Sequence, residues 1–341
     1  MKVSVIGLGL IGQERLRAID ELRVKHPELL LDKIYDANPG ARASAAKTRG
    51  LGVAAASIQE VLAGRPDWVI VAVPHDAILD VSVPLLKSGT NVLVEKPPGR
   101  SVDECERLIR ATTNDSQLYV GFNYRFYLGV SALLRDVSAG FFGRLISVNM
   151  TLGHGNSPGM EKSWKLNPVA CGGGCLIDPG IHLLDLVNLI SRDDVGCVSA
   201  VGWRGFWQTG IEEEAHLLLR DQAGCIYNVQ ASLNRWRSEF RIAVNGTDGY
   251  GVVEGRNRSY GAQSYRTGRR WGWQGGTSQV DSEVLQLRSD GDDSFAEELD
   301  AVMFGARERH SPCSAIEARE NMQLLSECYA KLTYSGETAR A

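Results

Sequence analysis

Three side chains with complementary chemistry stand out in the sequence: the amine of Lys96, the carboxylate of Asp178 and the imidazole of His182. Such groups can hold an alcohol and move its proton, which hydride transfer at the same carbon requires. Asp178 is a good N-cap residue, Pro179 suits the first helical position, and a spacing of four places Asp178 and His182 on one side of a helix. The preceding Gly172–Gly174 is expected to leave the site open to a ligand. Taken alone, the segment also fits a capped amphipathic helix with a buried histidine.

Lys96 follows a short apolar segment that ends abruptly. Val92–Val94 has the composition of a strand buried in a parallel sheet, and Pro97 with Pro98 stops that strand from continuing. Glu95 and Lys96 are therefore expected just beyond the carboxyl end of a strand, where open α/β sheets bind ligands. The alternative is an ordinary surface ion pair. We predict that both residues contact a cofactor and that Lys96 is catalytic.

A glycine-rich turn near the N-terminus predicts which cofactor this is. Lys2–Ile6 has the pattern of a buried strand, a helical pattern follows, and the turn between them has the form G-x-G-x-x-G. This context is typical of dinucleotide sites: the first glycine permits the tight turn, the second lets the pyrophosphate approach, and the third lets the helix pack on the strand. The free N–H groups at the helix start favour phosphate. The predicted contacts are Gly7, Gly9, Leu10, Ile11 and Gly12.

The ends of two later strands complete the predicted cofactor site. Leu31–Tyr35 is expected to be a strand, and Asp36 after it can accept hydrogen bonds from ribose hydroxyls and repel a 2′-phosphate. This favours NAD over NADP, unless Arg42 accommodates the phosphate instead of being a solvated helix residue. Pro74 and His75 follow the next apolar strand and are expected to line the cofactor cleft. A capping or surface role fits His75 equally well.

The order of the elements predicts an α/β protein with two domains. Alternating strands and helices indicate a doubly wound parallel sheet, that is, a Rossmann domain over residues 1–122. Residues 123–341 are expected to form an α+β domain with a large open, mainly antiparallel sheet, since its strand patterns follow at short intervals. Gly255–Gly276 has no clear period. The expected later elements are strands Leu145–Leu152, Val198–Trp203, Ala215–Leu219, Cys225–Ser232, Phe240–Val244 and Tyr250–Glu254, and helices Ser294–Glu308 and Ala315–Tyr334, the last of which can return to the first domain.

The composition narrows the class of protein and its surroundings. A formal net charge of −4 over 341 residues lacks the basic footprint of nucleic-acid binding. No apolar run is long enough to cross a membrane, and the chain starts directly with a strand pattern, so we expect neither a membrane span nor a signal peptide. Seven scattered cysteines suit a reducing cytoplasm. Cys171 and Cys175 lack the usual spacing of zinc ligands, so no metal site is predicted.

Five features together point to a known family: the G-x-G-x-x-G turn, Glu95-Lys96-Pro97, Asn123–Phe126, Trp164-Lys165 ahead of three glycines, and Asp178 with His182. The chain resembles the Gfo/Idh/MocA family, which includes glucose–fructose oxidoreductase and inositol dehydrogenase. The resemblance implies a Rossmann domain, a second domain whose open sheet often packs into dimers or tetramers, and NAD(P)-dependent oxidation or reduction of a sugar, nucleotide sugar or polyol. It implies catalytic roles for Lys96, Asp178 and His182. Pro179 stands where the family more often has an aliphatic residue, and we expect it to preserve the cap.

Further residues lie in segments expected to face the substrate, together with Asp178 and His182. Trp164 offers an aromatic surface to a sugar, although a core position is equally open. Lys165 can meet a substrate carboxylate or phosphate, or be solvated, and Arg125 can be purely structural. The remaining predicted substrate contacts are Asn123 and His154.

Two other functions are open for this scaffold. Some members of the family hydrolyse glycosides through transient oxidation by tightly held NAD, and a protein of this form could sense NAD without catalysis. The lysine, aspartate and histidine argue against a sensor, which has no need of them.

Overall fold

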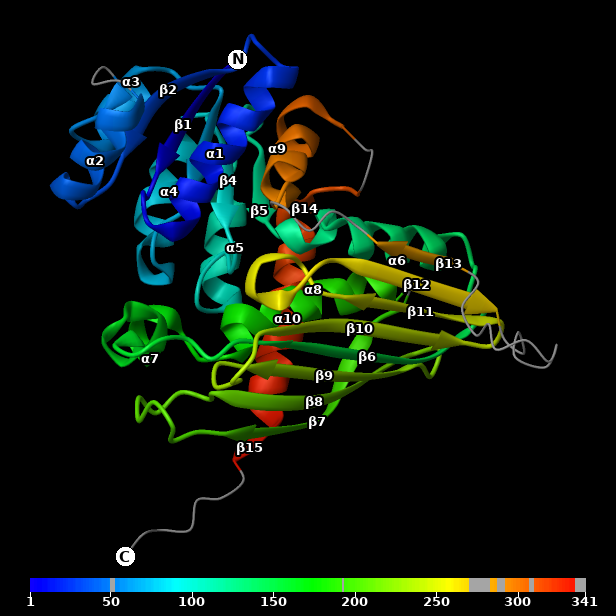
Figure 1. The fold of residues 1–341 in the computed structure, drawn as a ribbon. Coiled ribbons are helices and arrows are strands. Elements are labelled where there is room, and N and C mark those ends of the chain that lie inside the picture. The colour runs from blue at the N-terminus through cyan, green and yellow to red at the C-terminus, as the bar shows by residue number, and fades with distance from the viewer. Residues whose placement is uncertain (50–52, 192, 270–282, 287–291, 307–309, 335–341) are drawn as a thin grey trace, which may run out of the picture. The chain divides into compact units, whose positions relative to one another are not determined.

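A computed structural model describes residues 1–49, 53–191, 193–269, 283–286, 292–306 and 310–334 (Figure 1). Internal contacts divide the chain into two units. Unit 1 is Met1–Asn123 with Asp293–Glu320, and unit 2 is Tyr124–Asp292 with Asn321–Ala341. Where the sequence suggested a single boundary at residue 122, the chain instead returns to unit 1 over Asp293–Glu320 before it re-enters unit 2.

Unit 1 contains a six-stranded sheet in the order β14-β5-β4-β3-β1-β2. Strands β1 to β5 pair in parallel, and β14 pairs antiparallel with β5. Outside the named strands, Ala54 forms an isolated parallel bridge to Ile34 of β2. The elements are β1 (Lys2–Ile6), α1 (Leu10–Lys25), β2 (Leu30–Tyr35), α2 (Pro39–Arg49), α3 (Ile58–Ala63), β3 (Trp68–Val71), η2 (His75–Ala77), α4 (Ile78–Lys87), β4 (Asn91–Glu95), α5 (Val102–Ala111), β5 (Leu118–Gly121), α9 (Ser294–Phe304) and β14 (Cys313–Ser314).

The sheet of unit 1 is buried on both faces, which explains its uninterrupted apolar strands. Side chains alternate along β4, so Leu93 packs into one core and Val92 and Val94 into the other. The Leu93 core also holds Leu16 of α1 and Leu299 of α9. The apolar face of α9 therefore explains why a segment so late in the sequence belongs to unit 1.

Unit 2 contains a nine-stranded sheet in the order β13-β12-β11-β10-β6-β9-β8-β7-β15. Most neighbours are antiparallel, as predicted, but β6 with β9 and β7 with β15 are parallel, so the sheet is mixed. The strands are β6 (Leu145–Gly153), β7 (Val195–Trp203), β8 (Glu214–Asp221), β9 (Ile226–Ser232), β10 (Glu239–Gly246), β11 (Gly249–Glu254), β12 (Ser264–Arg269), β13 (Glu283–Gln286) and β15 (Leu332–Tyr334).

Helices of unit 2 pack against the sheet, with α6 meeting β11 and β12, and α8 meeting β6 (Figure 1). The helical segments wholly within unit 2 are α6 (Leu128–Ser138), η4 (Met160–Lys162), η5 (Trp164–Leu166), α7 (Pro168–Cys171), η6 (Leu176–Gly180), α8 (Ile181–Ile190) and η7 (Arg258–Tyr260). The short helix η3 (Asn123–Phe126) begins at the last residue of the first segment of unit 1, and α10 (Ala315–Lys331) belongs to unit 1 up to Glu320 and to unit 2 from Asn321. One prediction was wrong here: Leu332–Tyr334 is a strand paired with β7 rather than the end of a helix. Ser264–Arg269, in the segment for which no element was predicted, is a strand paired with β11.

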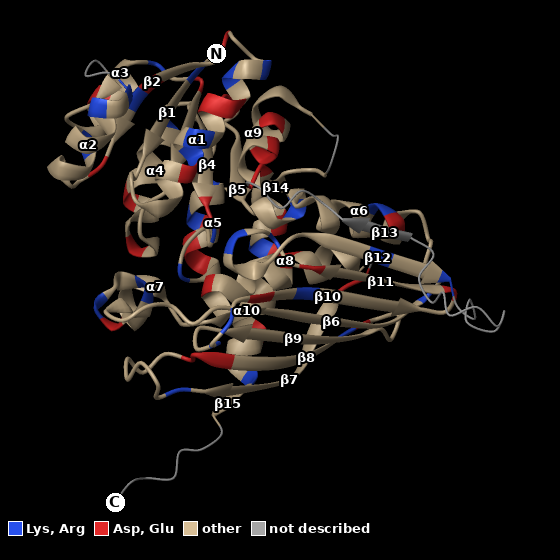
Figure 2. Ribbon diagram, viewed as in Figure 1, with Lys and Arg blue, Asp and Glu red and all other residues tan. Residues whose placement is uncertain are grey.

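The expectation that no apolar run is long enough to cross a membrane was wrong for the stretch Pro168–Ile190, which is long and apolar enough by composition, but 78% of its most apolar window is buried within the protein. It is also divided between α7, η6 and α8. Both features are those of a core segment. Acidic and basic residues are interspersed along the described helices and strands of each unit (Figure 2).

Candidate active site

The glycine-rich turn of unit 1 has the geometry of a dinucleotide cradle. Gly7 has φ +92°, and a Cβ there would collide with the carbonyl oxygen of Ala72, the residue after β3. A Cβ at Gly12 would collide with the Gly7 carbonyl, so this glycine brings α1 against the turn. A Cβ at Gly9 would have no atom within 4 Å, and Leu10 beside it is 74% exposed. The open space lies where α1 begins, so the turn fits a pyrophosphate.

The end of β2 is tied directly to this turn. Asp36 accepts hydrogen bonds from the backbone N–H of Leu8 (2.7 Å) and of Asn38 (2.8 Å). Arg42 is bound rather than solvated, because its Nη1 donates to the Asp36 carbonyl (2.7 Å) and its guanidinium lies 5.5 Å from the Tyr35 ring centroid. A carboxylate for ribose hydroxyls and a cation for a 2′-phosphate therefore stand side by side.

Glu95 takes part in a buried ion-pair network and not in a surface pair. Its Oε1 accepts from Arg15 Nε (2.5 Å), and Arg15 Nη2 lies 2.6 Å from Glu298 Oε2. Burial alone would lower the pKa of Arg15, but the charges of Glu95 and Glu298 outweigh it and raise that pKa. The network fixes the end of β4, where half-buried Lys96 follows with a cis peptide bond to Pro97.

The other predicted cofactor residues of unit 1 follow β3. Pro74 is half-buried and precedes the short helix η2, and His75 is buried, with 5% of its surface exposed. This burial excludes a plain surface role for His75. Contact of Pro74, His75, Glu95 and Lys96 with a cofactor stays a prediction.

In unit 2, the predicted cap at Asp178 was wrong. Helix α8 begins at Ile181 after an N-cap at Gly180, and Asp178 has non-helical angles (φ −146°, ψ 103°) followed by a cis bond to Pro179. The Asp178 carboxylate does not cap because it accepts from Lys165 Nζ at 2.8 Å. The Asp178 charge is the main cause that raises the pKa of Lys165. Lys165 lies in η5 and Asp178 in η6, so the two paired residues are 13 positions apart in the sequence.

His182 lies in the first turn of α8 and is 4% exposed. Its ring stacks on Tyr124, with centroids 3.7 Å apart and planes 8° apart. Burial raises the pKa of Tyr124, and Asp178 is among the charges that raise it further. The charge of Asp178 therefore acts on the ring against which His182 stacks, although Asp178 and His182 do not share a helix face.

Two residues of the segment without a clear period complete this group. Arg256 lies 5.1 Å from the Tyr124 ring centroid and 3.8 Å from that of Tyr260. Tyr260 also contributes to the electrostatic environment of Lys165. We call Tyr124, Lys165, Asp178, His182, Arg256 and Tyr260 the polar cluster. Sequence reasoning missed Tyr124, Arg256 and Tyr260, and the Arg- and Tyr-rich composition of 255–276 was the only signal for the last two.

Two of the three glycines before Asp178 lie against other parts of unit 2. Cβ atoms at Gly173 and Gly174 would collide with Tyr329 and with the Glu212 carbonyl, respectively. The buried Glu212 carboxylate accepts from Gly174 N (2.8 Å), Leu176 N (3.1 Å) and Tyr329 Oη (2.7 Å). Burial raises the pKa of Glu212. The glycines therefore serve close packing, in contrast to the ligand access that we expected.

The remaining predicted substrate residues fall into two groups. Trp164 lies beside the polar cluster, with Lys165 Nζ 5.8 Å from its ring centroid, while His154 follows β6 and its Nδ1 accepts from Asn156 N (3.3 Å). Asn123 donates to Ser294 Oγ (2.8 Å) within unit 1. Arg125 is 1% exposed and forms two hydrogen bonds with Asp185 (2.8 and 2.5 Å). These contacts favour the structural alternative for Arg125.

Comparison with known proteins decides the family. The model of the oxidoreductase family with an NAD-binding Rossmann fold matches residues 1–122, and the model of the GFO/IDH/MocA C-terminal domain matches residues 130–251. The chain belongs to the Gfo/Idh/MocA family. The resemblance read from the sequence and the predicted fold class are thereby confirmed.

Similar proteins include dehydrogenases and reductases of sugars. Levoglucosan dehydrogenase of Pseudarthrobacter phenanthrenivorans is 26% identical over 210 residues, which cover 59% of this chain and 53% of that protein. The match thus spans about half of that relative. A solved levoglucosan dehydrogenase with NADH and levoglucosan has a TM-score of 0.81 at 16% identity, covering 97% and 96% of the two chains. A 3-ketoreductase from Actinomadura kijaniata with NADP has a TM-score of 0.77 at 18% identity, covering 98% of each chain.

Proposed function

We propose that this protein is an NAD(P)-dependent oxidoreductase that transfers a hydride between nicotinamide and a secondary alcohol or ketone of a sugar, nucleotide sugar or polyol. The observation that carries the proposal is the polar cluster: a carboxylate bound to Lys165 and an imidazole stacked on Tyr124, two residues of one short segment. Membership of the family and the open cradle at Gly9 support it.

The roles of the residues follow from their chemistry. His182 takes the hydroxyl proton during oxidation and returns it during reduction. Asp178, held by Lys165, orients the imidazole or a neighbouring substrate hydroxyl. Lys96 holds the reacting oxygen and balances its charge, a role that rests on the resemblance. The nicotinamide, when bound, accepts or supplies the hydride.

For the cofactor, we propose NAD ahead of NADP. The Asp36 carboxylate beside the glycine turn favours the ribose hydroxyls, whereas Arg42 next to it would suit a 2′-phosphate. Proteins of this fold have been solved with either cofactor. Replacing Arg42 with alanine should leave the Kd for NADH within about twofold of the wild-type value, because we expect the ribose contacts to come from Asp36. If the variant bound NADH and NADPH more weakly by the same factor, the separate roles of Asp36 and Arg42 would be contradicted.

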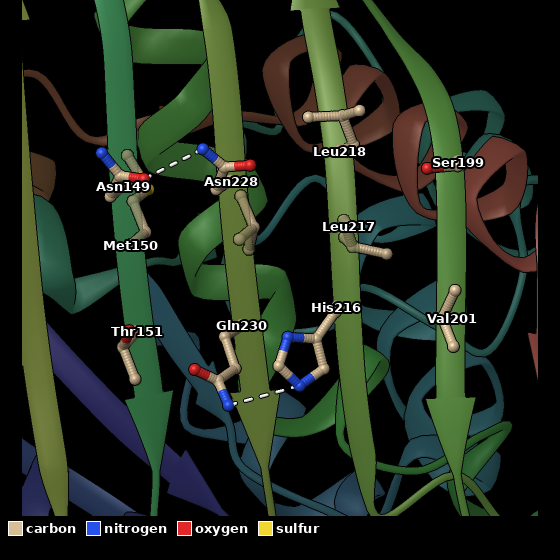
Figure 3. A pocket seen from close by; sticks show the side chains of 11 residues that line it. Asn149, Met150, Thr151, Ser199, Val201, His216, Leu217, Leu218, Asn228 and Gln230 are labelled. Atoms are coloured by element: carbon tan, nitrogen blue, oxygen red, sulfur yellow. Dashed lines mark hydrogen bonds between the residues drawn. The ribbon is translucent and has the colours of Figure 1, made fainter. Parts of the chain in front are cut away.

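We further propose a homodimer or homotetramer formed through the sheet of unit 2. The face that carries Asn149, Asn228, His216 and Gln230 is hollowed and exposes Val201 (43%), with hydrogen bonds joining neighbouring strands (Figure 3). A mixed polar and apolar face of this kind can pair with itself. Light scattering on the purified protein should give a multiple of 37.2 kDa.

A cytoplasmic location is proposed from the thiols. All seven cysteines are free and buried, which suits a reducing compartment. The proposed partner is a small sugar or polyol, and we propose no binding to nucleic acid or to a membrane.

The test is a screen of inositols, aldoses, uronates and nucleotide sugars with NAD and NADP in parallel, followed through the absorbance of reduced nicotinamide. His182→Asn should lower kcat/KM on the best substrate by about 10²- to 10⁴-fold, the usual share of acid–base catalysis. His310→Asn is the control, because His310 lies outside the polar cluster. Turnover that is equal in both variants would reject the assignment, as would a protein that purifies with bound NAD and cleaves an aryl glycoside without consuming added cofactor.

A further inference from the structure

Arg15 and Arg125 are fully buried and Arg256 is half-buried, and the three differ in their counter-charges. Arg15 is paired with Glu95 and Glu298, and Arg125 is paired with Asp185. Arg256 is half-buried, yet within the part of the chain that the structure describes it forms no ion pair with a carboxylate. Its surroundings therefore require a separate explanation.

The neighbours of Arg256 are phenols. Its Nη1 donates to Tyr127 Oη (3.0 Å), and its guanidinium faces the rings of Tyr260 and Tyr124 at 3.8 and 5.1 Å. Its Nε is buried and has no acceptor among the described residues. Aromatic faces compensate a desolvated cation only in part, and a buried charge without a counter-ion is costly.

The position of Arg256 suggests where a counter-ion would come from. The Tyr124 ring that it faces is also the ring on which His182 stacks, so the guanidinium and the imidazole contact the same side chain. Two carboxylates linked to residues of this region have other partners: Asp178 binds Lys165, and Asp292 accepts from Tyr127 Oη (3.1 Å). The polar cluster thus contains one cation, Arg256, that no carboxylate of the described residues pairs with, and this cation lies beside the proposed reacting group.

We propose that Arg256 binds an anionic group of the substrate, a carboxylate or a phosphate, and that the substrate class is an acidic sugar, a sugar phosphate or a nucleotide sugar. The planar guanidinium suits bidentate recognition of either group, and its stacking on Tyr260 fixes its plane. This inference rests on the proposed function, because it assigns the substrate of the same site.

Kinetics on matched substrates test the proposal. Wild type should have a higher kcat/KM on an anionic member of a set (glucuronate, glucose 6-phosphate, UDP-glucose) than on neutral glucose or myo-inositol. Arg256→Gln should lower kcat/KM on that anionic substrate by about 10- to 100-fold, mainly through KM, as expected for a charged hydrogen bond. A preference for glucuronate identifies a carboxylate and a preference for the phosphate esters identifies a phosphate; either supports the proposal.

Two variants provide the controls. Arg241→Gln makes the same change in net charge on β10, where Arg241 is 3.2 Å from Glu254, and should leave the anionic preference intact. Arg256→Lys keeps the charge but loses the planar fork, so it should retain part of the preference and show that the site folds. A neutral best substrate, or equal effects of Arg256→Gln and Arg241→Gln, would overturn the proposal.

A binding measurement separates this inference from the proposed function. Inorganic phosphate or glucuronate should raise the melting temperature of wild type, by calorimetry, and should do so less for Arg256→Gln than for Arg241→Gln. If this holds while no substrate turns over, the anion site stands and the oxidoreductase proposal fails. If neutral sugars turn over and neither anion gives an Arg256-dependent shift, the function stands and the anion site is refuted.

Discussion

Gly7–Gly12 in unit 1 and Gly172–Gly174 in unit 2 are both glycine-rich turns that precede a helix, but their glycines have different neighbours. A Cβ at Gly9 would meet no atom within 4 Å. Cβ atoms at Gly173 and Gly174 would collide with Tyr329 and Glu212. The first turn leaves space outside the chain, whereas the second brings two parts of the chain together.

The difference shows how each turn serves a site. Space at Gly9 is available to a cofactor. In the second turn, Glu212 binds the N–H groups of Gly174 and Leu176, and Asp178 N donates to the Gly174 carbonyl (2.9 Å). The close packing of these glycines therefore fixes the backbone that carries the Asp178 carboxylate. A glycine motif alone does not say which of the two purposes it serves.

The largest expected effect comes from filling the second turn. Gly174→Ala should lower the free energy of unfolding by about 2–4 kcal/mol, because its Cβ would overlap the Glu212 backbone and neither segment can move without breaking its hydrogen bonds. Denaturant titration measures this. Gly9→Ala is the matched control and should stay within about 0.5 kcal/mol of wild type. If the two variants were equally stable, the contrast between the turns would be lost.

An intermediate effect is expected in the first turn. Gly9→Val should raise the Kd for NADH by about 10- to 100-fold, since its side chain would occupy the space next to the start of α1 where the phosphates are expected. Isothermal titration gives the Kd, and the melting temperature without cofactor should not change. Unchanged affinity would mean that this space is not the cofactor site.

The smallest expected effect is the pH dependence of the second turn. Burial raises the pKa of Glu212, so in the window between its ordinary pKa and the raised one the folded state holds a proton that the unfolded state releases. The contribution of Glu212 to the free energy of unfolding is therefore present at low pH and falls as the pH rises through that window. Glu212→Gln should remove this component. Denaturation curves at several pH values would contradict the prediction if variant and wild type kept a constant difference.

Much of unit 1 could be predicted from the sequence because its signals are local. The strands predicted at Lys2–Ile6, Leu31–Tyr35 and Val92–Val94 lie where the patterns placed them, as β1, β2 and β4. The sterics of the glycine turn also follow from adjacent residues. The return of Asp293–Glu320 to unit 1 was less accessible, because α9 is an apolar helix whose partner α1 lies far away in the sequence.

The site in unit 2 was harder to predict from the sequence, because its contacts join residues that are far apart along the chain. Lys165, Asp178 and His182 were identified as residues, but the helix cap assigned to Asp178 was wrong because a lysine 13 residues earlier binds its carboxylate. Strand Ser264–Arg269 has no clear alternation and is fixed by pairing with β11. Nothing local indicates that Arg256 faces Tyr124 across 132 residues of chain.

The sequence by itself determined the dinucleotide turn, the family and most of the strands, since turn geometry and alternating burial depend on neighbouring residues. Only the tertiary structure decided what each polar side chain binds. It assigned Glu95 to Arg15, Arg125 to Asp185 and Asp178 to Lys165, and it left Arg256 among tyrosines. The physical reason is that the partner of a buried charge is chosen by three-dimensional proximity, which the packing of apolar residues sets and the spacing of residues along the chain does not.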